Sequence, residues 1–455
     1  MTGTTRQAGA AVPGTIPDDP EAAASRIAGA VVIGRTTEFF DFFVYAIASV
    51  LVFPKVFFSA PDHLTGMLYS FAVFALAFVA RPIGTVIFVA LDREFGPLVK
   101  QTAALFLLCG STMAISFLPG YAEIGLAAPL LLAIFRGGQG LGLGGAWDGL
   151  PSLLALNAPP HRRGWYSMIP QLGAAFGFML ASGLFIVLTS ALNSEDFLAW
   201  GWRFPFFVAL ALNVVALFAR LRLILTPEFS TLFREKELQP QPVFKTLRTH
   251  GRDVLIGAFV PLASYAMFHI VTIFPLSWTT LYTTEAASDF LTVELIGAVI
   301  GAVSIMLSGV LADRIGRRRL LTIGAIAIAV FSFFTAPLIN AGPAGRYAFV
   351  LIGFALLGLS LGQARGAMAS RFSRAYRYTA SAMTSDIAWL IGAGFAPIVA
   401  LGLSSRFDLK FAGYYLLSGA ICTLLALAIV QRTDPPEEKT FGSSSRMTAT
   451  AIQPL

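Results

Sequence analysis

Long apolar runs separated by short polar connections dominate this chain and predict its secondary structure. Twelve stretches of about 20 residues are apolar enough to cross a bilayer as helices. They lie at 27–53, 64–91, 101–119, 126–156, 165–190, 202–224, 253–279, 291–312, 319–340, 346–370, 378–402 and 411–431. The pattern therefore predicts an all-α membrane protein with twelve transmembrane helices.

A polar interruption at 225–252 predicts a cytoplasmic linker between two six-helix halves, 26–224 and 253–432. The terminal segments 1–25 and 433–455 are polar, and the first lacks the basic-then-apolar order of a cleaved signal peptide. We expect both to be disordered cytoplasmic tails. Two parallel halves with a substrate site between them near the midplane are a common arrangement in transporters.

Composition agrees with a membrane protein and argues against several classes of function. The 455 residues are 56% hydrophobic and 13% charged, whereas soluble domains carry about 25% charged residues. Cys109 and Cys422 lie in apolar runs and offer neither a disulfide framework nor metal-ligand spacing. No P-loop, metal cluster or nucleophilic triad is recognisable in the sequence. We therefore expect no enzymatic activity and no cofactor.

Lysine and arginine residues concentrate in the even-numbered connections between the predicted helices, which the positive-inside rule assigns to the cytoplasm. The odd-numbered connections hold only Lys55, Arg203, Arg346, Arg406 and Lys410. Both termini are therefore predicted to be cytoplasmic. The net charge of +7 follows from this bias, and we expect no nucleic-acid partner.

Two loop segments carry a family resemblance. The segment GVLADRIGRRRL (309–320) resembles the cytoplasmic loop motif of the major facilitator superfamily, G-x-L-a-D-r-x-G-r-k, and FVALDREFGPLVK (88–100) is a degenerate copy in the first half. Within that superfamily, GRTTEFFDF (34–42) resembles the first-helix pattern of the metabolite:proton symporters, with Arg35 in place of an asparagine. RGGQGLGLGGAW (136–147) also matches, although Ala146 replaces the family's acid. The resemblance implies the major facilitator fold and a symporter of the bacterial inner membrane.

An acidic stripe in the first predicted helix is the main candidate for proton coupling. At about 100° per residue, Glu38, Asp41 and Tyr45 fall within a sector of roughly 60°. Ionisable residues inside a membrane are costly and need a partner. Arg136 stands where many proton-coupled relatives place an arginine that faces a first-helix aspartate. We interpret Asp41 as the coupling carboxylate, Arg136 as its counter-charge and Glu38 as a second protonatable group; a structural carboxylate pair is the alternative.

Other polar residues inside the predicted spans are candidates for substrate contact. Tyr265 and His269 are spaced i, i+4 and therefore share a helix face. The full predicted set is Tyr45, Arg136, Gln139, Gln171, Tyr265, His269, Gln363, Arg365, Asp386 and Trp389. Arg81 is interpreted as structural, bonding carbonyls freed around Pro82, and Glu294 receives little weight because it lies near the predicted outer surface.

Charged residues at the predicted cytoplasmic helix ends form a separate group. They can pair with facing carboxylates and helix dipoles, and so hold the two halves together when the protein opens outward. This gating group comprises Asp92, Arg93, Asp148, Asp313, Arg314, Arg317 and Arg318.

Taken with the family resemblance, two intramembrane arginines, Arg136 and Arg365, favour a carboxylate-bearing metabolite as the substrate, imported with protons by a monomer in the lipid bilayer. A zwitterionic osmolyte is the alternative within the same family. A drug:proton antiporter is disfavoured because the fifth helix lacks the G-x-x-x-G-P pattern associated with exporters. A non-transporting membrane receptor on the same fold is the alternative from another class.

Overall fold

The computed structural model describes residues 20–146, 154, 158–224, 239–364 and 371–433. Every regular element in these ranges is helical. Within the described residues, eight helical stretches are long and apolar enough to cross a membrane, and one of them, α3, contains two of the predicted spans. Helices are present in all twelve predicted spans. The prediction of an all-α, twelve-helix membrane protein is confirmed.

The first half contains six predicted spans and several short connecting helices. Its elements are α1 (Pro20–Leu51), α2 (Phe53–Val56), α3 (His63–Ser116), α4 (Tyr121–Ile124), α5 (Ala127–Gly145), η1 (Pro160–Arg162), α7 (Arg163–Ala191), α8 (Ser194–Ala199), η2 (Gly201–Arg203) and α9 (Phe204–Ile224). α3 is interrupted by a sharp turn at Gly96, which has a φ of 85°. This turn separates the second span from the third. Gly316 occupies the same region, with φ 89°, in the corresponding loop of the second half. Both loop motifs thus place glycine where other residues would be strained.

The second half has more interrupted helices than the first. Its elements are α11 (Val243–Phe259), α12 (Leu262–Thr272), α13 (Phe274–Tyr282), α14 (Ala287–Ile315), α15 (Arg317–Ser332), α16 (Thr335–Asn340), α17 (Gly342–Ala364), α18 (Arg377–Trp389), the π-helical turn η4 (Leu390–Gly394), α19 (Ala396–Arg406) and α20 (Lys410–Thr433). The seventh span breaks at Ile273, just before Pro275, and the eleventh span changes to π-helical geometry at η4. α11 begins inside the predicted linker 225–252 and runs past its end.

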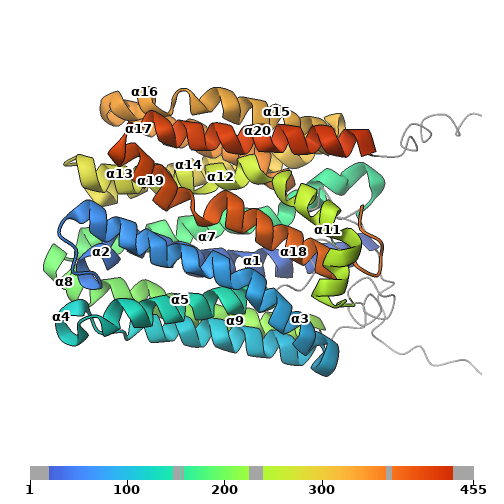
Figure 1. Ribbon diagram of the computed structural model, residues 1–455, viewed down its shortest axis with the longest axis horizontal. Coiled ribbons are helices and arrows are strands. Elements are labelled where there is room, and N and C mark those ends of the chain that lie inside the picture. The colour runs from blue at the N-terminus through green and yellow to red at the C-terminus, as the bar shows by residue number, and fades with distance from the viewer. Residues whose placement is uncertain (1–19, 147–153, 155–157, 225–238, 365–370, 434–455) are drawn as a thin grey trace, which may run out of the picture.

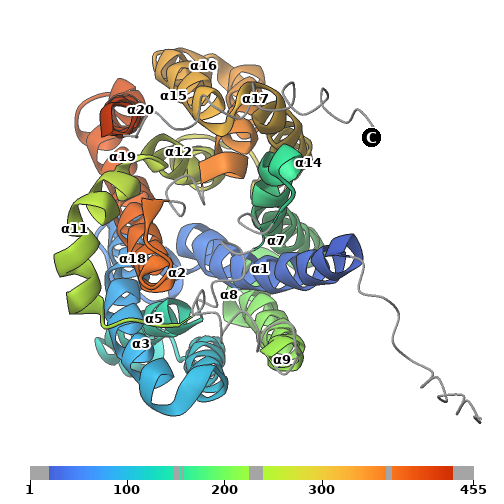
Figure 2. The same cartoon turned by 90° about the vertical axis from the view of Figure 1, so that its right-hand side faces the viewer.

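Figures 1 and 2 show the helices of the two halves running side by side along one long axis. Several helix pairs join the halves; among them, α7 packs against α14 and α17, and α3 packs against α18 and α19. We call the end of the bundle that carries the Gly96 and Gly316 turns the basic end, because Lys100, Arg163 and Arg317 lie there, and we call the other the opposite end. Figure 2 views the bundle from the basic end.

Candidate functional site

Arg136 lies on α5, which packs closely against α3. A Cβ atom added at Gly140 or Gly144 would lie 2.3 Å from a backbone oxygen of α3, so only glycine permits this approach. Arg136 is 1% exposed, and its guanidinium carbon lies 3.8 Å from the ring centroid of Tyr45 and 4.9 Å from that of Phe74. Aromatic faces attract a cation electrostatically, most strongly when water is excluded. The aromatic rings therefore help to hold this buried cation.

Arg136 is connected to Asp41 through two side chains. Its Nη1 donates to Gln139 Oε1 at 3.0 Å, and Gln139 Nε2 donates to Thr112 Oγ1 at 2.8 Å. Thr112 Oγ1 in turn donates to the two carboxylate oxygens of Asp41, at 3.1 and 3.2 Å. We call this chain of hydrogen bonds the relay. The predicted pairing of Arg136 with Asp41 thus takes the form of an indirect, buried connection.

Glu38 has a different partner on the same helix. Arg35, one turn earlier on α1, donates to its carboxylate. Arg35 also lies over the ring of Phe39, at 4.9 Å from the centroid. The residue that departs from the family pattern therefore neutralises one of the two acids on the first helix.

Five residues of the predicted substrate set present buried polar atoms that have no hydrogen-bond partner in the described part of the chain. These atoms are Tyr45 Oη, Arg136 Nη2, both side-chain amide atoms of Gln171, both ring nitrogens of His269, and Trp389 Nε1. Buried polar groups are nearly always paired, so a set of unpaired ones needs an explanation. A bound polar solute would supply one.

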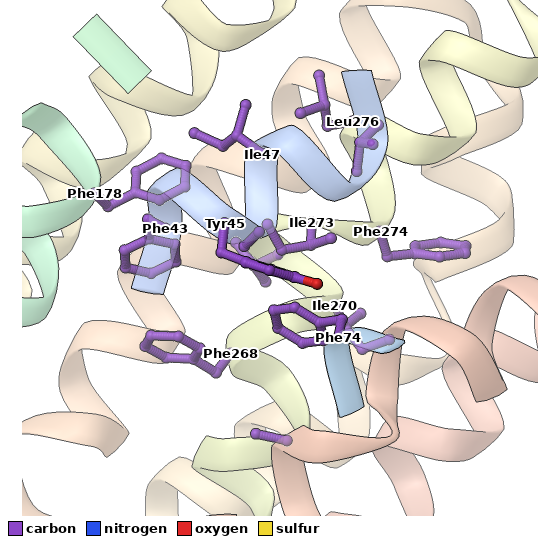
Figure 3. Close-up of a cluster of buried hydrophobic side chains, with 14 of the residues drawn as sticks. Phe43, Tyr45, Ile47, Phe74, Phe178, Phe268, Ile270, Ile273, Phe274 and Leu276 are labelled. Carbon is purple, nitrogen blue, oxygen red and sulfur yellow. The ribbon is translucent and has the colours of Figure 1, made fainter. Parts of the chain in front are cut away.

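The two halves contribute to the same aromatic surroundings. The His269 ring lies 5.4 Å from Phe42 and 5.3 Å from Phe74, and both of these rings also flank Arg136. Figure 3 shows Tyr45 close to Phe74 of the first half and to Ile270 and Ile273 of the second. The structure thus gathers residues that are far apart in the sequence into one buried region at the centre of the bundle.

A second aromatic contact completes this region. Trp389 on α18 stacks on Tyr265 of α12 with ring centroids 4.3 Å apart, and it lies 5.1 Å from Phe268. Both helices belong to the interrupted spans of the second half. The breaks in these spans therefore lie close to candidate substrate residues.

An apolar cavity adjoins these residues. Phe43 and Phe178 line it from the first half, and Phe268, Thr272 and Phe354 line it from the second. Because both halves contribute walls, separating the halves would open this space.

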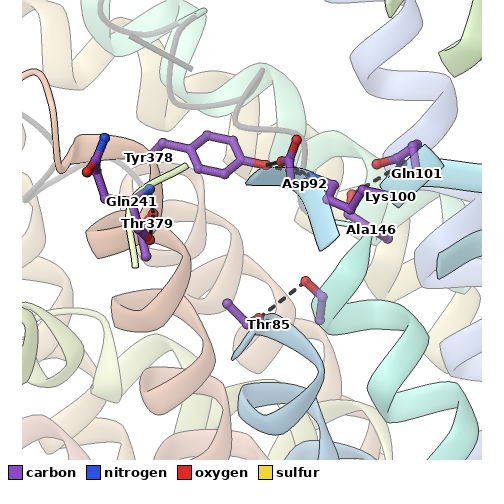
Figure 4. A network of polar contacts seen from close by, with 9 residues as sticks. Thr85, Asp92, Lys100, Gln101, Ala146, Gln241, Tyr378 and Thr379 are labelled. Carbon is purple, nitrogen blue, oxygen red and sulfur yellow. Dashed lines mark hydrogen bonds and ion pairs between the residues drawn. The ribbon is translucent and has the colours of Figure 1, made fainter. Parts of the chain in front are cut away.

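Two sets of contacts join the halves at the basic end. In the first, Lys100 Nζ lies 3.2 Å from Asp92 Oδ2 and donates to Tyr378 Oη at 2.5 Å (Figure 4). Lys100 and Asp92 are each 4% exposed. We call this group the first latch. Arg93, which was predicted to share the gating role, is exposed.

The second latch lies where the Gly316 turn meets the start of α7. Asp313 accepts from the backbone N–H groups of Gly164, at 2.6 Å, and Trp165, at 3.1 Å. Arg317 donates to Gln363 Oε1 at 3.2 Å and to the hydroxyl of Ser167. Gln363, predicted to contact substrate, here serves this latch. Arg318 donates to the carbonyl of Leu427 within the second half, and Arg314 is exposed.

Asp386 also joins the halves. It accepts from Arg81 Nε at 2.7 Å and from Thr85 Oγ1 at 2.5 Å, and all three residues lie on the α3–α18 interface. Arg81 was predicted to bond carbonyls near Pro82, whereas the structure pairs it with this carboxylate. Asp386, predicted to line the substrate cavity, is committed to an ion pair in this state. Two further predicted residues, Asp148 and Arg365, lie outside the described residues.

Two contributors were missed by sequence reasoning. Thr112 is a hydroxyl residue in an apolar run, and nothing in its spacing relates it to Asp41. Lys100 contributed only to the prediction of which loops are cytoplasmic. Its position eight residues after Asp92, across a glycine turn, could have indicated that the two side chains pair.

Comparisons with known proteins agree with the fold. The family described as "Major Facilitator Superfamily" matches residues 31–397. The inner membrane metabolite transport protein YhjE of Escherichia coli (strain K12) is 39% identical over 419 residues, which is 90% of this chain and 94% of that protein. A proline/betaine transporter of Salmonella typhimurium (strain LT2) is 31% identical, covering 86% of this chain and 80% of that protein. Among solved structures, the proton:xylose symporter XylE is 18% identical with a TM-score of 0.67, covering 91% of this chain and 96% of that one.

Proposed function

This chain belongs to the Major Facilitator Superfamily, and we propose that it is a proton-coupled symporter that imports a small carboxylate-bearing metabolite across the inner membrane. One observation carries this proposal. Arg136 is a buried cation with an unpartnered donor, Nη2, and the relay connects it to the buried carboxylate of Asp41. A single side chain is thereby placed to respond both to an anionic solute and to a proton.

The substrate site needs donors for a carboxylate and apolar walls for the rest of the molecule. A guanidinium can hold a carboxylate through two parallel hydrogen bonds. Tyr45 Oη, the His269 ring nitrogens and Trp389 Nε1 are further unpartnered polar atoms. Phe42, Phe74 and Phe268 provide apolar surface around them. This donor-rich, aromatic lining suits an organic acid with a hydrocarbon or ring body.

Substrate and proton transport are coupled because the substrate carboxylate and Asp41 compete for the Arg136 guanidinium. Without substrate, the positive charge of Arg136 supports an ionised Asp41 through Gln139 and Thr112. A bound carboxylate draws the guanidinium toward itself and weakens that support. Proton uptake by Asp41 then keeps the buried site close to neutral, which avoids an uncompensated charge inside the membrane.

Alternating access would use the latches at the basic end, which we assign to the cytoplasmic side. Both latches are formed in this state, which supports a state closed toward the basic end. Release of substrate and proton to the cytoplasm requires Lys100 to leave Tyr378 and Asp313 to leave the start of α7. The interrupted spans α12–α13 and α18–α19 lie beside the site and provide places where the helices can bend.

A thermal-shift screen of the purified protein tests the substrate class. We would use succinate, 2-oxoglutarate, 4-hydroxybenzoate, cyclohexanecarboxylate and glycine betaine. An acid that stabilises the protein should also accumulate in proteoliposomes when the outside is acidified, and this accumulation should collapse when a protonophore removes the gradient. Stabilisation without gradient-dependent accumulation would overturn the coupling.

A zwitterionic osmolyte is the second candidate, favoured by the stacked pair of Tyr265 and Trp389 beside Phe268. A quaternary ammonium group binds well against aromatic faces, while Arg136 would hold the carboxylate. One similar protein is named as a proline/betaine transporter. Stabilisation by glycine betaine and by none of the four acids would select this candidate.

A further inference from the structure

Glu294 is a buried acid that the proposed mechanism does not use. It lies on α14 of the second half and is 0% exposed. Neither carboxyl oxygen has a hydrogen-bond partner in the part of the chain that the structure describes. Its predicted position near one end of its span suggested exposure to water, but the fold encloses it completely.

The face of α14 that carries Glu294 leads to the apolar cavity. Gly301 and Ile305, seven and eleven residues further along, lie within about 20° of Glu294 around the helix. Both line the apolar cavity. Glu294 lies roughly 10 Å from Gly301 along the helix axis, toward the opposite end. Opening the halves at the opposite end would therefore admit water along the stripe that contains this carboxyl group.

No ionisable group on the helices around α14 contacts Glu294 within the described ranges. On α17, Arg346 and Tyr347 both bind Glu285. On α13, the only titratable residue is Tyr282, in its last turn. The ionisable groups of η1, α7 and α15 lie at the basic end: His161, Arg162, Arg163, Tyr166, Arg317, Arg318 and Arg319. On α14 itself they are Asp289 in the first turn and Asp313 and Arg314 in the last.

We propose that Glu294 is a second proton-binding site, loaded from the opposite end, and that it must carry its proton for the halves to close there. This inference rests on the proposed proton-coupled function. An ionised carboxylate enclosed without a partner is strongly disfavoured, whereas the neutral acid is tolerated. Because Glu294 is fully enclosed and does not line the cavity, nothing larger than a proton reaches it in this state. The carboxylate takes a proton from water while the opposite end is open. It returns the proton to water through the cavity when the basic end opens.

Infrared spectroscopy of the purified protein tests the site without any substrate. At neutral pH, the carbonyl-stretch band of a protonated carboxylic acid should be present in the wild type and reduced in Glu294→Gln. The matched control is Glu123→Gln, which changes an exposed acid on α4 at the same end and should leave the band intact. If Glu294→Gln does not fold, Glu294→Asp should keep the band and shift its frequency. A band unchanged in the substituted protein would overturn the inference.

Proton counting in proteoliposomes separates this inference from the proposed function. The probe is whichever of the four acids stabilises the protein most, and a pH-sensitive dye inside the vesicles reports the protons. Glu294→Gln should move about one proton fewer per acid than the wild type, by linkage. Equal ratios in both would overturn the role of Glu294 alone. The absence of any dye response in the wild type would overturn the proposed function instead.

Discussion

Replacing Thr112 by valine should uncouple transport, because this one hydroxyl joins the two charged partners of the relay. Thr112 Oγ1 accepts from Gln139 at 2.8 Å and donates to Asp41 at 3.1 and 3.2 Å. Valine has nearly the same shape, so packing in this fully buried position is preserved. A hydrogen bond to a charged group is worth about 1.5–3 kcal/mol. At about 1.4 kcal/mol per factor of ten, the linkage between substrate and proton should weaken roughly ten- to hundredfold.

Two transport assays on the same proteoliposomes measure this loss. Net accumulation driven by an acidic exterior requires coupling, whereas exchange of labelled for unlabelled acid without a gradient does not. The ratio of accumulation to exchange should fall at least tenfold in Thr112→Val, by the same energetic argument. Thr112→Ser restores the hydroxyl and should recover most of that ratio. An unchanged ratio in the valine variant, with normal folded yield, would refute the relay.

Three further substitutions test separate parts of the mechanism. Asp41→Asn should abolish uphill accumulation while exchange continues, and undiminished accumulation against a gradient would remove Asp41 from the coupling role. Asp313→Asn removes a charged acceptor from two backbone N–H groups, and these hydrogen bonds are worth about 1–3 kcal/mol. Turnover should slow with little change in substrate affinity. A large loss of affinity with an unchanged transport rate would contradict the role of Asp313 in the second latch. Arg365→Gln should weaken binding of an acid in calorimetry, and an unchanged affinity in the purified variant would place the carboxylate contact elsewhere.

The twelve-helix architecture could be predicted from the sequence because each membrane span is a recognisable local pattern. Each span is a continuous apolar run, and the helices observed fall where those runs predict. The turns at Gly96 and Gly316 were readable for a similar reason, since the loop motif and its left-handed glycine are close together in the chain. Interruptions within spans were harder to predict, because the π-helical turn at η4 depends on packing against neighbouring helices.

The sequence predicted which residues belong to the candidate site, but it did not predict which of them contact one another. Tyr45, Arg136 and His269 were identified because polar side chains inside a membrane are rare, and the fold brings them around shared phenylalanine rings. Spacing along the chain carries no information on which residues of different helices meet. Gln363 and Asp386 were therefore assigned to substrate, whereas the structure joins them to Arg317 and Arg81 across the two halves.

Glu294 is another residue whose surroundings could not be predicted from the sequence. Its distance from the end of a predicted helix indicated proximity to water, and a carboxylate in that position is usually solvated. The depth to which neighbouring helices enclose it is a property of the three-dimensional packing. Its complete burial became evident only from the fold.

If an acid bound at Arg136 drives a proton onto Asp41, binding of the acid should remove protons from solution. The purified protein would be titrated in weakly buffered solution with the acid that stabilises it most, while a pH indicator counts the protons removed from solution. The wild type should take up protons as the acid binds, and Asp41→Asn should bind the acid with a clearly smaller uptake. Binding to the wild type without proton uptake, or equal uptake by both proteins, would contradict the account.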